Sequence, residues 1–501
     1  MLRPAPVWLV VHGPVAVPLR RPALARPSTQ RSLTSSTLAA VIGLVGAVSL
    51  ATPAHAVEVQ FEGFYRARAR MFSSLTIDPD LEGAEPTRAW VQHRLWLAPR
   101  FVISDKVAIY TEFRGLDGVT WGQRPYAEPD PTLPLSSTDG SLPLVFTDDL
   151  RSPTSTLSDG LPRGMPDFSL WRVYGEIHGQ AGTFRFGRVP LQWGVGIWQN
   201  DGLGLNADFG DSIDRVQWER AFDEGRIFVR AAGEVDSYGL VSPTSQNIYG
   251  GSAAFAYRTE RIEVGLNAQL KRATGGFDDT GGDLQPFTMA TGSLAGDFEQ
   301  GNLHFGGEVV GRFGSGQLGD TDNASVRALG GVLFAELELG KPKLGVEAGF
   351  ASGDGDPTDD TITTFTFDRD YNLGIILFEQ PMPVFTDTTG RDLSGTLTGN
   401  GISNAIFGRV HAEYPLPEDL RLEAAAAAAR TFKVPDTTRT GYGLEFNLGL
   451  RYQPRDDVDV VGTAALALPG SYYRAYTDNE NAPDGFRGFV LGGQVLARIK
   501  F

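Results

Sequence analysis

Arginine occupies three alternate positions of the first extended segment, a spacing that suits anion binding. Arg66, Arg68 and Arg70 alternate there with Ala67 and Ala69. Side chains two residues apart on a β-strand point to the same face, so these three guanidiniums would form one basic row. A guanidinium is planar and can bind a carboxylate or a phosphate through two parallel hydrogen bonds, and it can also pair with Glu.

Further segments carry arginine on the same parity, with a few acids between them. If the apolar parity faces lipid, the opposite parity lines a lumen, because a slip of one residue would place charges in hydrocarbon. The candidate pore-lining and solute-binding residues are Arg66, Arg68, Arg70, Arg88, Arg94, Arg100, Arg114, Arg172, Arg185, Arg215, Arg230, Glu62 and Glu112. Two interpretations remain open: an electropositive track for anions, and a lattice of Arg–Glu pairs that only fills a polar interior. The excess of Arg over acid in the first three segments favours the track.

Catalysis finds little support in these residue types. Beyond residue 56 the histidines are His93, His178, His304 and His411, and the chain has no Cys. A hydrolase needs a nucleophile, a His and an orienting group at one place, and no Ser is marked as activated by its neighbours. We therefore expect neither enzymatic activity nor a cofactor.

One acidic run could collect calcium through oxygen ligands. In SGDGDPTDD the acids are Asp354, Asp356, Asp359 and Asp360. The run lacks the fixed ligand positions and the closing Glu of an EF-hand. A solvated acidic loop near lipopolysaccharide is therefore the favoured interpretation, and calcium binding is the alternative.

The elements that would position these residues are β-strands. From Val57 onward the chain divides into segments of roughly ten to sixteen residues with period-2 alternation. Short links, such as Ser104-Asp105, alternate with long ones, such as residues 117–167 and 353–401. Short periplasmic turns and long outer loops are typical of bacterial outer-membrane proteins. The sequence therefore predicts an all-β fold, a closed antiparallel transmembrane β-barrel of about 18 strands.

Residues 1–56 are typical of a signal peptide. Arginines precede the apolar run Leu38–Ala51, and Ala54-His55-Ala56 is an A-x-A cleavage signature. We expect cleavage after Ala56, so that the barrel comprises residues 57–501. Removal of the segment changes the formal net charge from −16 to −21, because it takes away five Arg and no acid. Such an acidic chain argues against a nucleic-acid partner.

The segment 188–212 is the third long connection from the N-terminus, and it is rich in Gly, Trp, Asn and Asp. It is too long for a hairpin turn and too apolar for a solvated loop, so we expect it to fold into the lumen and narrow it. The expected constriction residues are Arg188, Trp193, Trp198, Asn200, Asp201, Asn206 and Asp208. A loop packed on the rim of the barrel is the alternative.

Two motifs resemble the alginate-export family of outer-membrane barrels. They are Phe186-Gly187-Arg188 with Trp193-Gly194, Phe209-Gly210-Asp211 and Asp214-Arg215, and the later Ala351-Ser352-Gly353-Asp354 with Asp356-Pro357 and Thr364-Phe365. The resemblance implies an 18-stranded barrel with an Arg-rich lumen that conducts anionic polysaccharide. Val189 departs from this pattern, because Gln is common after Gly-Arg in that family.

These patterns together predict a porin-like channel in the bacterial outer membrane for anionic or polar solutes, including oligosaccharides or polysaccharides such as alginate. The alternative is a structural or surface-interaction barrel whose lumen is occluded and whose loops bind a partner. The expected partners are outer-membrane lipid and lipopolysaccharide, the solute, and the barrel-assembly machinery. The last would recognise the C-terminal strand, which ends at Phe501.

Overall fold

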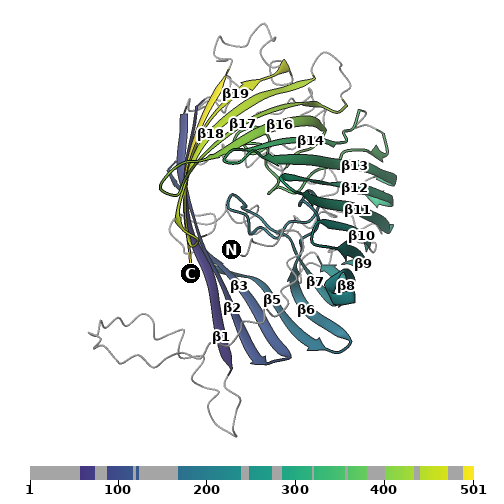
Figure 1. Ribbon diagram of the computed structural model, residues 1–501. Coiled ribbons are helices and arrows are strands. Elements are labelled where there is room, and N and C mark those ends of the chain that lie inside the picture. Colours follow the sequence, from purple (N-terminus) through teal and green to yellow (C-terminus); the bar gives the residue numbers. More distant parts are fainter. Residues whose placement is uncertain are drawn as a thin grey trace, which may run out of the picture.

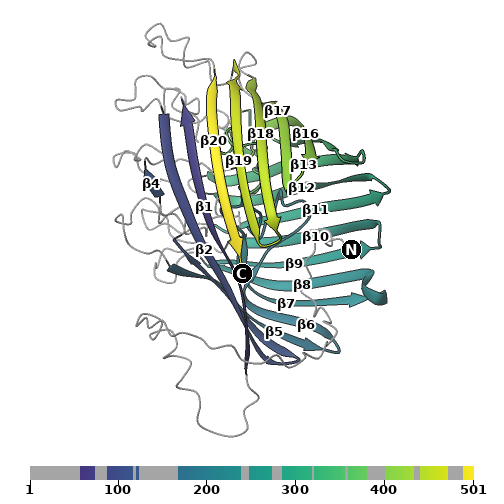
Figure 2. The ribbon, with the colours of Figure 1, turned by 60° about the vertical axis from the view of Figure 1, so that its left-hand side comes forward.

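Successive antiparallel hairpins form one sheet that closes on itself, because the first strand pairs with both the second and the last. Figure 2 shows this closure, with β20 lying beside β1. The computed structural model describes residues 57–73, 87–116, 120–122, 168–237, 247–273, 285–318, 321–355, 359–380, 401–433, 440–471 and 489–501. The expected signal peptide (residues 1–56) and most of the expected outer loop 117–167 lie outside these residues.

The described chain contains 20 strands, of which β4 and β15 are short additions and 18 form the wall. The strands are β1 (Glu58–Ser73), β2 (Thr87–Ser104), β3 (Val107–Gly115), β4 (Thr120–Gly122), β5 (Phe168–Gly179), β6 (Gly182–Pro190), β7 (Ser212–Phe222), β8 (Ile227–Ser237), β9 (Asn247–Arg258), β10 (Ile262–Ala273), β11 (Phe287–Gln300), β12 (Leu303–Leu318), β13 (Thr321–Glu338), β14 (Lys343–Ala351), β15 (Thr361–Ile362), β16 (Ala405–Pro415), β17 (Leu420–Thr431), β18 (Gly441–Arg455), β19 (Val458–Pro469) and β20 (Val490–Lys500). A 3-10 turn, η5 (Asp223–Gly225), joins β7 to β8. The expected closed antiparallel barrel of about 18 strands is confirmed.

The two faces of the wall differ in chemistry, as the alternation predicts. Leu266, Leu294 and Leu333 point outward and are 54%, 56% and 67% exposed. Their strand neighbours on the other parity are polar and buried, for example Asn267 and Ser293. Only a lipid environment would make so many large apolar side chains on the outer face favourable, so this face is the membrane surface.

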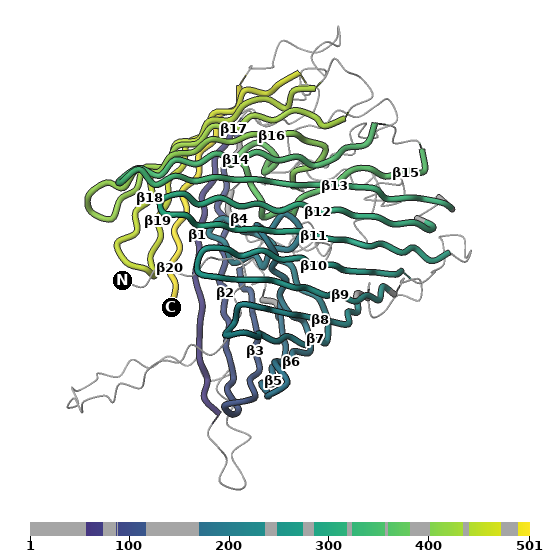
Figure 3. Tube along the Cα trace, turned by 45° about the vertical axis from the view of Figure 1, so that its right-hand side comes forward, coloured from purple at the N-terminus to yellow at the C-terminus, as the bar shows by residue number. Residues whose placement is uncertain are grey.

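Short turns connect neighbouring strands at one end of the barrel, and Figure 3 shows the chain running through these successive hairpins. Two residues separate β2 from β3, β5 from β6 and β11 from β12. No helix in the described part of the chain is long and apolar enough to cross a membrane.

One irregularity alters the parity of the inner wall. The register between β3 and β5 shifts between Glu112 and Phe113, so that β5 carries one extra residue there. As a consequence both Trp171 and Arg172 are buried, whereas Leu170 and Val173 on either side are exposed on the outer face. Such a β-bulge re-aims side chains locally, and here it places an aromatic ring and a guanidinium together inside the barrel.

The parity of the wall can be tested with introduced thiols, since the chain has no Cys. Arg409 on β16 faces the lumen and pairs with Glu347, whereas the outward neighbour Val410 is 55% exposed. We expect Arg409→Cys to react with a water-soluble, membrane-impermeant thiol reagent in proteoliposomes and Val410→Cys to remain unmodified. A lipid-soluble maleimide should label Val410→Cys, which controls for folding. Equal labelling of both variants by the water-soluble reagent would contradict the assigned faces.

Candidate functional site: two loops inside the barrel

The segment between β6 and β7 (loop A, residues 191–211) runs inside the barrel rather than over its rim (Figure 1). Trp193 and Ile197 in this loop are 1% and 0% exposed. The indole Nε1 of Trp193 donates a hydrogen bond of 3.0 Å to Ser293 Oγ on the inner face of β11. Burial of a large apolar side chain is worth roughly 1.5–3 kcal/mol, so these residues stabilise the inward path.

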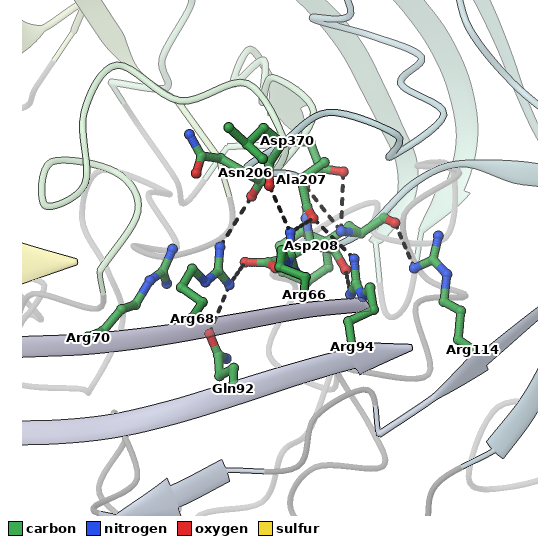
Figure 4. A network of polar contacts seen from close by, with 12 residues as sticks. Arg66, Arg68, Arg70, Gln92, Arg94, Arg114, Asn206, Ala207, Asp208 and Asp370 are labelled. Carbon is green, nitrogen blue, oxygen red and sulfur yellow. Dashed lines mark hydrogen bonds and ion pairs between the residues drawn. The ribbon is translucent and has the colours of Figure 1, made fainter. Parts of the chain in front are cut away.

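Five arginines on the inner faces of β1, β2, β3 and β5 hold the other side of loop A, and Figure 4 shows four of them. The contacts are Arg66 Nη1 with Ala207 O at 2.6 Å, Arg68 Nη1 with Asn206 O at 3.3 Å, Arg94 Nη1 with Ala207 O at 3.1 Å, Arg114 Nη1 with Phe209 O at 2.9 Å and Arg172 Nη2 with Asp201 O at 2.7 Å. Hydrogen bonds from a charged donor are stronger than neutral ones. These guanidiniums are therefore directed at the backbone of loop A.

Asp208 is the acidic group at the centre of this contact. Its Oδ1 lies 2.5 Å from Arg66 Nη2, and its Oδ2 contacts Arg68 Nη2. Burial alone would raise the pKa of the Asp208 carboxyl, but the surrounding guanidiniums, Arg68 and Arg66 foremost, hold that pKa well below its usual range. The lowered pKa favours the charged carboxylate, which ties the tip of loop A to β1.

A buried wall glutamate holds the first part of loop A. Glu308 on β12 accepts a hydrogen bond from Ser293 Oγ at 2.8 Å and one from the Ile197 backbone N–H at 3.3 Å. Gly194 approaches the same carboxylate so closely that a Cβ there would lie 2.5 Å from Glu308 Oε2, and its φ is +54°. Both the space and the left-handed backbone therefore require glycine at residue 194.

A second loop also lies inside the barrel (loop B, residues 359–380). Glu445 on β18 accepts hydrogen bonds from three successive backbone N–H groups, those of Ile375 at 2.7 Å, Ile376 at 3.2 Å and Leu377 at 2.7 Å. Tyr371 donates from its hydroxyl to Glu347 on β14 at 2.8 Å. Consecutive N–H groups that converge on a carboxylate form an anion-binding nest, so the wall glutamate fixes the loop backbone.

Loops A and B meet near the arginines of β1. Asp370 of loop B accepts hydrogen bonds from the backbone N–H groups of Asp208 at 2.6 Å and Phe209 at 3.1 Å. The Asp368 N–H donates to Ile197 O at 2.9 Å. Burial raises the pKa of Asp370, and the negative charge of Asp208 adds to this rise. The two loops therefore form one connected layer across the lumen.

The inner wall beyond the loops is a lattice of Arg–Glu pairs. Arg185 lies 2.5 Å from Glu176 and 2.8 Å from Glu219, and Arg215 lies 3.6 Å from Glu234. The structure thus divides the arginines of the predicted lining between two uses. Those on β6 and β7 pair with wall acids, as the lattice interpretation expects, and most of those on β1, β2, β3 and β5 bind loop A.

The remaining residues of the predicted lining have mixed positions. Arg70 binds Glu379 of loop B at 2.7 Å and Gln494 at 2.8 Å, and Glu112 pairs with Arg172 at 2.7 Å and with Arg114 at 3.1 Å. The guanidinium of Arg230 lies 5.8 Å from the ring of Trp193, and that of Arg100 lies 4.9 Å from the ring of Tyr110. Glu62 is exposed near the start of β1. Arg88 belongs to β2, and its side chain lies outside the described residues.

Loop A contains the expected constriction residues with one exception. Trp198 is buried, Asn200 and Asp201 accept hydrogen bonds from nearby loop N–H groups, and Asn206 lies beside Arg68. Arg188 instead belongs to β6 and points outward, where it pairs with Asp214 at 2.8 Å. The expectation for Arg188 is wrong because β6 continues to Pro190, which keeps residue 188 on the parity of the outer face.

The acidic run near residue 354 is not gathered around a common point in the described part of the chain. Asp354 is buried and accepts a hydrogen bond from the Thr363 N–H at 3.2 Å, and Asp359 accepts one from the Thr361 N–H at 2.7 Å. Asp360 is exposed, and Asp356 lies outside the described residues. Among the described residues no group of three or more His, Asp or Glu side chains is placed to hold a metal ion.

The inward position of loop B is not predicted from the sequence, because its acidic run makes the segment 353–401 resemble a solvated outer loop. The signal that could have found it is its composition, since FTFDRDYNLGIILFEQ is as apolar as loop A. Phe365, Ile376 and Leu377 in this run are fully buried. The argument that an apolar loop needs burial applies equally to both segments.

The fold and this site define a closed β-barrel that is integral to the outer membrane, with a polar interior and two inward loops. The chain matches no protein-family model and no curated protein sequence.

Solved barrels of similar architecture include a BenF-like porin from Pseudomonas fluorescens (9% identity, 89% of this chain and 98% of that chain covered, TM-score 0.49). OccK9 (OpdG) of Pseudomonas aeruginosa is another (12% identity, 89% and 98% covered, TM-score 0.46). OpdK of Pseudomonas aeruginosa, solved with vanillate, is a third (10% identity, 88% and 98% covered, TM-score 0.46). At this level of similarity the likeness concerns the kind of barrel and says nothing of the solute.

Gly194→Ala tests whether Glu308 positions loop A. We expect the new methyl group to push loop A from Glu308 and to increase open-channel current noise in planar bilayers. The matched control is Gly225→Ala in the turn between β7 and β8, where φ is +92° and no atom lies within 4 Å of a Cβ. Both variants carry the left-handed backbone penalty of about 1–2 kcal/mol, and only the first adds the collision. The same noise in both variants would show that Glu308 does not position the loop.

Proposed function

We propose that the protein is an outer-membrane channel through which anionic or polar solutes diffuse past a constriction made by loops A and B. The observation that carries the proposal is the connected layer of the two loops, held to the wall on several sides by charged hydrogen bonds. Because the wall holds both loops in fixed positions, we expect them to narrow the lumen without closing it. The polar, Arg-rich interior is suited to hydrated solutes rather than to lipid or apolar molecules.

Anionic solutes are the proposed preference because the wall near the constriction is rich in guanidinium. Four arginines, Arg66, Arg68, Arg70 and Arg94, surround the tip of loop A, and they lie near Asp208 of loop A, with Arg70 also bound to Glu379 of loop B. A positive wall raises the local concentration of anions in a narrow, low-dielectric passage. Oligosaccharides and polysaccharides with uronate groups, such as alginate, are the larger members of the proposed class.

A second candidate is a structural or surface-interaction barrel with an occluded lumen. The observation that favours it is the apolar packing of both loops inside the barrel, where Trp193, Ile197, Phe365 and Ile376 belong to one buried cluster. Conductance distinguishes the two candidates, because an occluded barrel carries no steady current.

We predict steady single-channel currents from the purified protein in planar bilayers, with a reversal potential that indicates anion preference at low salt. Replacement of residues 194–206 by a short Gly-Ser linker should raise the conductance, because it removes the part of loop A that Glu308 and Trp193 anchor. The anion preference should also increase, because the replacement removes the acidic Asp201 and leaves the arginines of the wall in place.

The same linker inserted between Thr259 and Glu260, in the turn joining β9 to β10, serves as the control and should leave the conductance unchanged. A wild-type protein that is correctly folded and electrically silent would favour the occluded barrel. Cation preference at low salt would reject the anionic solute class.

A further inference from the structure

The contact between loop A and β1 has the form of a ligand in a binding site. Each oxygen of the Asp208 carboxylate contacts a different guanidinium, Oδ1 that of Arg66 and Oδ2 that of Arg68. The two arginines are 4% and 1% exposed, whereas the carboxylate side chain retains 20% exposure. The cationic groups are therefore built into the wall, and the anionic group reaches them from the loop side.

The wall around this contact supplies cations and the loops supply the anions. Arg70 beside the pair binds Glu379 of loop B at 2.7 Å, and Arg94 donates to Ala207 O at 3.1 Å and to Asp208 O. Arg68 Nη2 also donates a hydrogen bond of 2.8 Å to Oε1 of Gln92, a neutral side chain of the wall. If the tip of loop A moved away, both guanidiniums would lose the Asp208 carboxylate, and the loss of a charged partner is costly for a buried guanidinium.

We propose that Arg66 and Arg68 form a carboxylate-binding site, that Asp208 occupies it as an internal ligand, and that solutes bearing several carboxylates displace Asp208 on their way through the lumen. This inference rests on the proposed channel function and names the solute group that the constriction recognises. A carboxylate fits the site because it presents two oxygens, one to each guanidinium, as Asp208 does. Loop A would then yield to an anionic solute and keep the site filled in its absence.

The internal ligand should be a strong competitor. A tethered carboxylate acts at an effective concentration in the millimolar range or above, so an external carboxylate must exceed this concentration or offer more than one anionic group. The proposal therefore predicts weak binding of external carboxylates to the wild-type protein and much stronger binding once Asp208 is neutralised. Asparagine is suitable for this change because it keeps the shape of the side chain and removes the charge.

The experiment measures block of single-channel current by citrate in 0.1 M KCl, together with citrate binding to the detergent-solubilised protein by calorimetry. We expect Asp208→Asn to lower the half-blocking concentration of citrate and its dissociation constant at least tenfold relative to the wild type. The gain should shrink in 1 M KCl, where the Debye length is only about 3 Å. Adding Arg68→Gln to Asp208→Asn should abolish the gain, because one of the two guanidiniums is then missing.

The matched control is Glu219→Gln, which removes one negative charge from a lumen carboxylate that pairs with Arg185 in the wall lattice beyond the loops. We expect Glu219→Gln to change citrate binding less than twofold. An equal gain in both variants would show that only the net charge matters, and unchanged citrate binding in Asp208→Asn would also overturn the proposal. If Asp208→Asn does not fold, Asp208→Ser is to be measured against the same criteria.

Failure of this inference is distinguishable from failure of the proposed function. A wild-type protein that conducts but whose Asp208 variants bind citrate no more tightly would keep the channel and reject the internal ligand. A silent wild-type protein whose Asp208→Asn variant binds citrate tightly in calorimetry would reject the channel and keep the carboxylate site.

Discussion

The structure depends on the charged hydrogen bonds between the inner-wall arginines and the backbone of loop A. Arg66, Arg68, Arg94, Arg114 and Arg172 are buried. A buried guanidinium without a partner costs several kcal/mol, so each of these side chains needs hydrogen-bond acceptors. Backbone carbonyls of residues 201–211 and the Asp208 carboxylate are these acceptors. The same hydrogen bonds hold loop A inside the barrel.

Loop B and the first part of loop A are held by contacts of the opposite polarity, in which carboxylates accept hydrogen bonds from loop N–H groups. Glu308 and Glu445 accept hydrogen bonds from backbone N–H groups of loops A and B, and Asp370 joins the two loops in the same way. Loop carbonyls thus face wall cations, and loop N–H groups face carboxylates. Since nearly all of these backbone groups would otherwise be buried without partners, each loop conformation is determined by the wall it crosses. The layer that the two loops form is accordingly determined by both loops and by the strands that hold them.

The comparison of sequence with structure follows the same division. Period-2 alternation correctly predicted a closed barrel of about 18 strands, because a strand with lipid on one side and a polar lumen on the other must alternate whatever its neighbours are. Where local structure breaks the period, the sequence argument fails. The bulge that places Trp171 beside Arg172 inside the barrel has no local signal, and Arg188 was misplaced because the length of β6 depends on its pairing with β7. The apolar composition of loop B could have predicted its burial, but the acidic run before it favoured a solvated loop.

The sequence by itself determined the barrel, the face on which most wall residues lie and the presence of an apolar segment that needs burial. Only the tertiary structure decided what the arginines bind. Arg66 and Asp208 are separated by 142 residues, and Arg70 and Glu379 by 309. A guanidinium on a strand can bind a free anion, a wall glutamate or a loop carbonyl with similar chemistry, so its residue type does not choose among them. The choice follows from which groups the closed barrel brings within hydrogen-bonding distance, and that distance is a property of the whole chain.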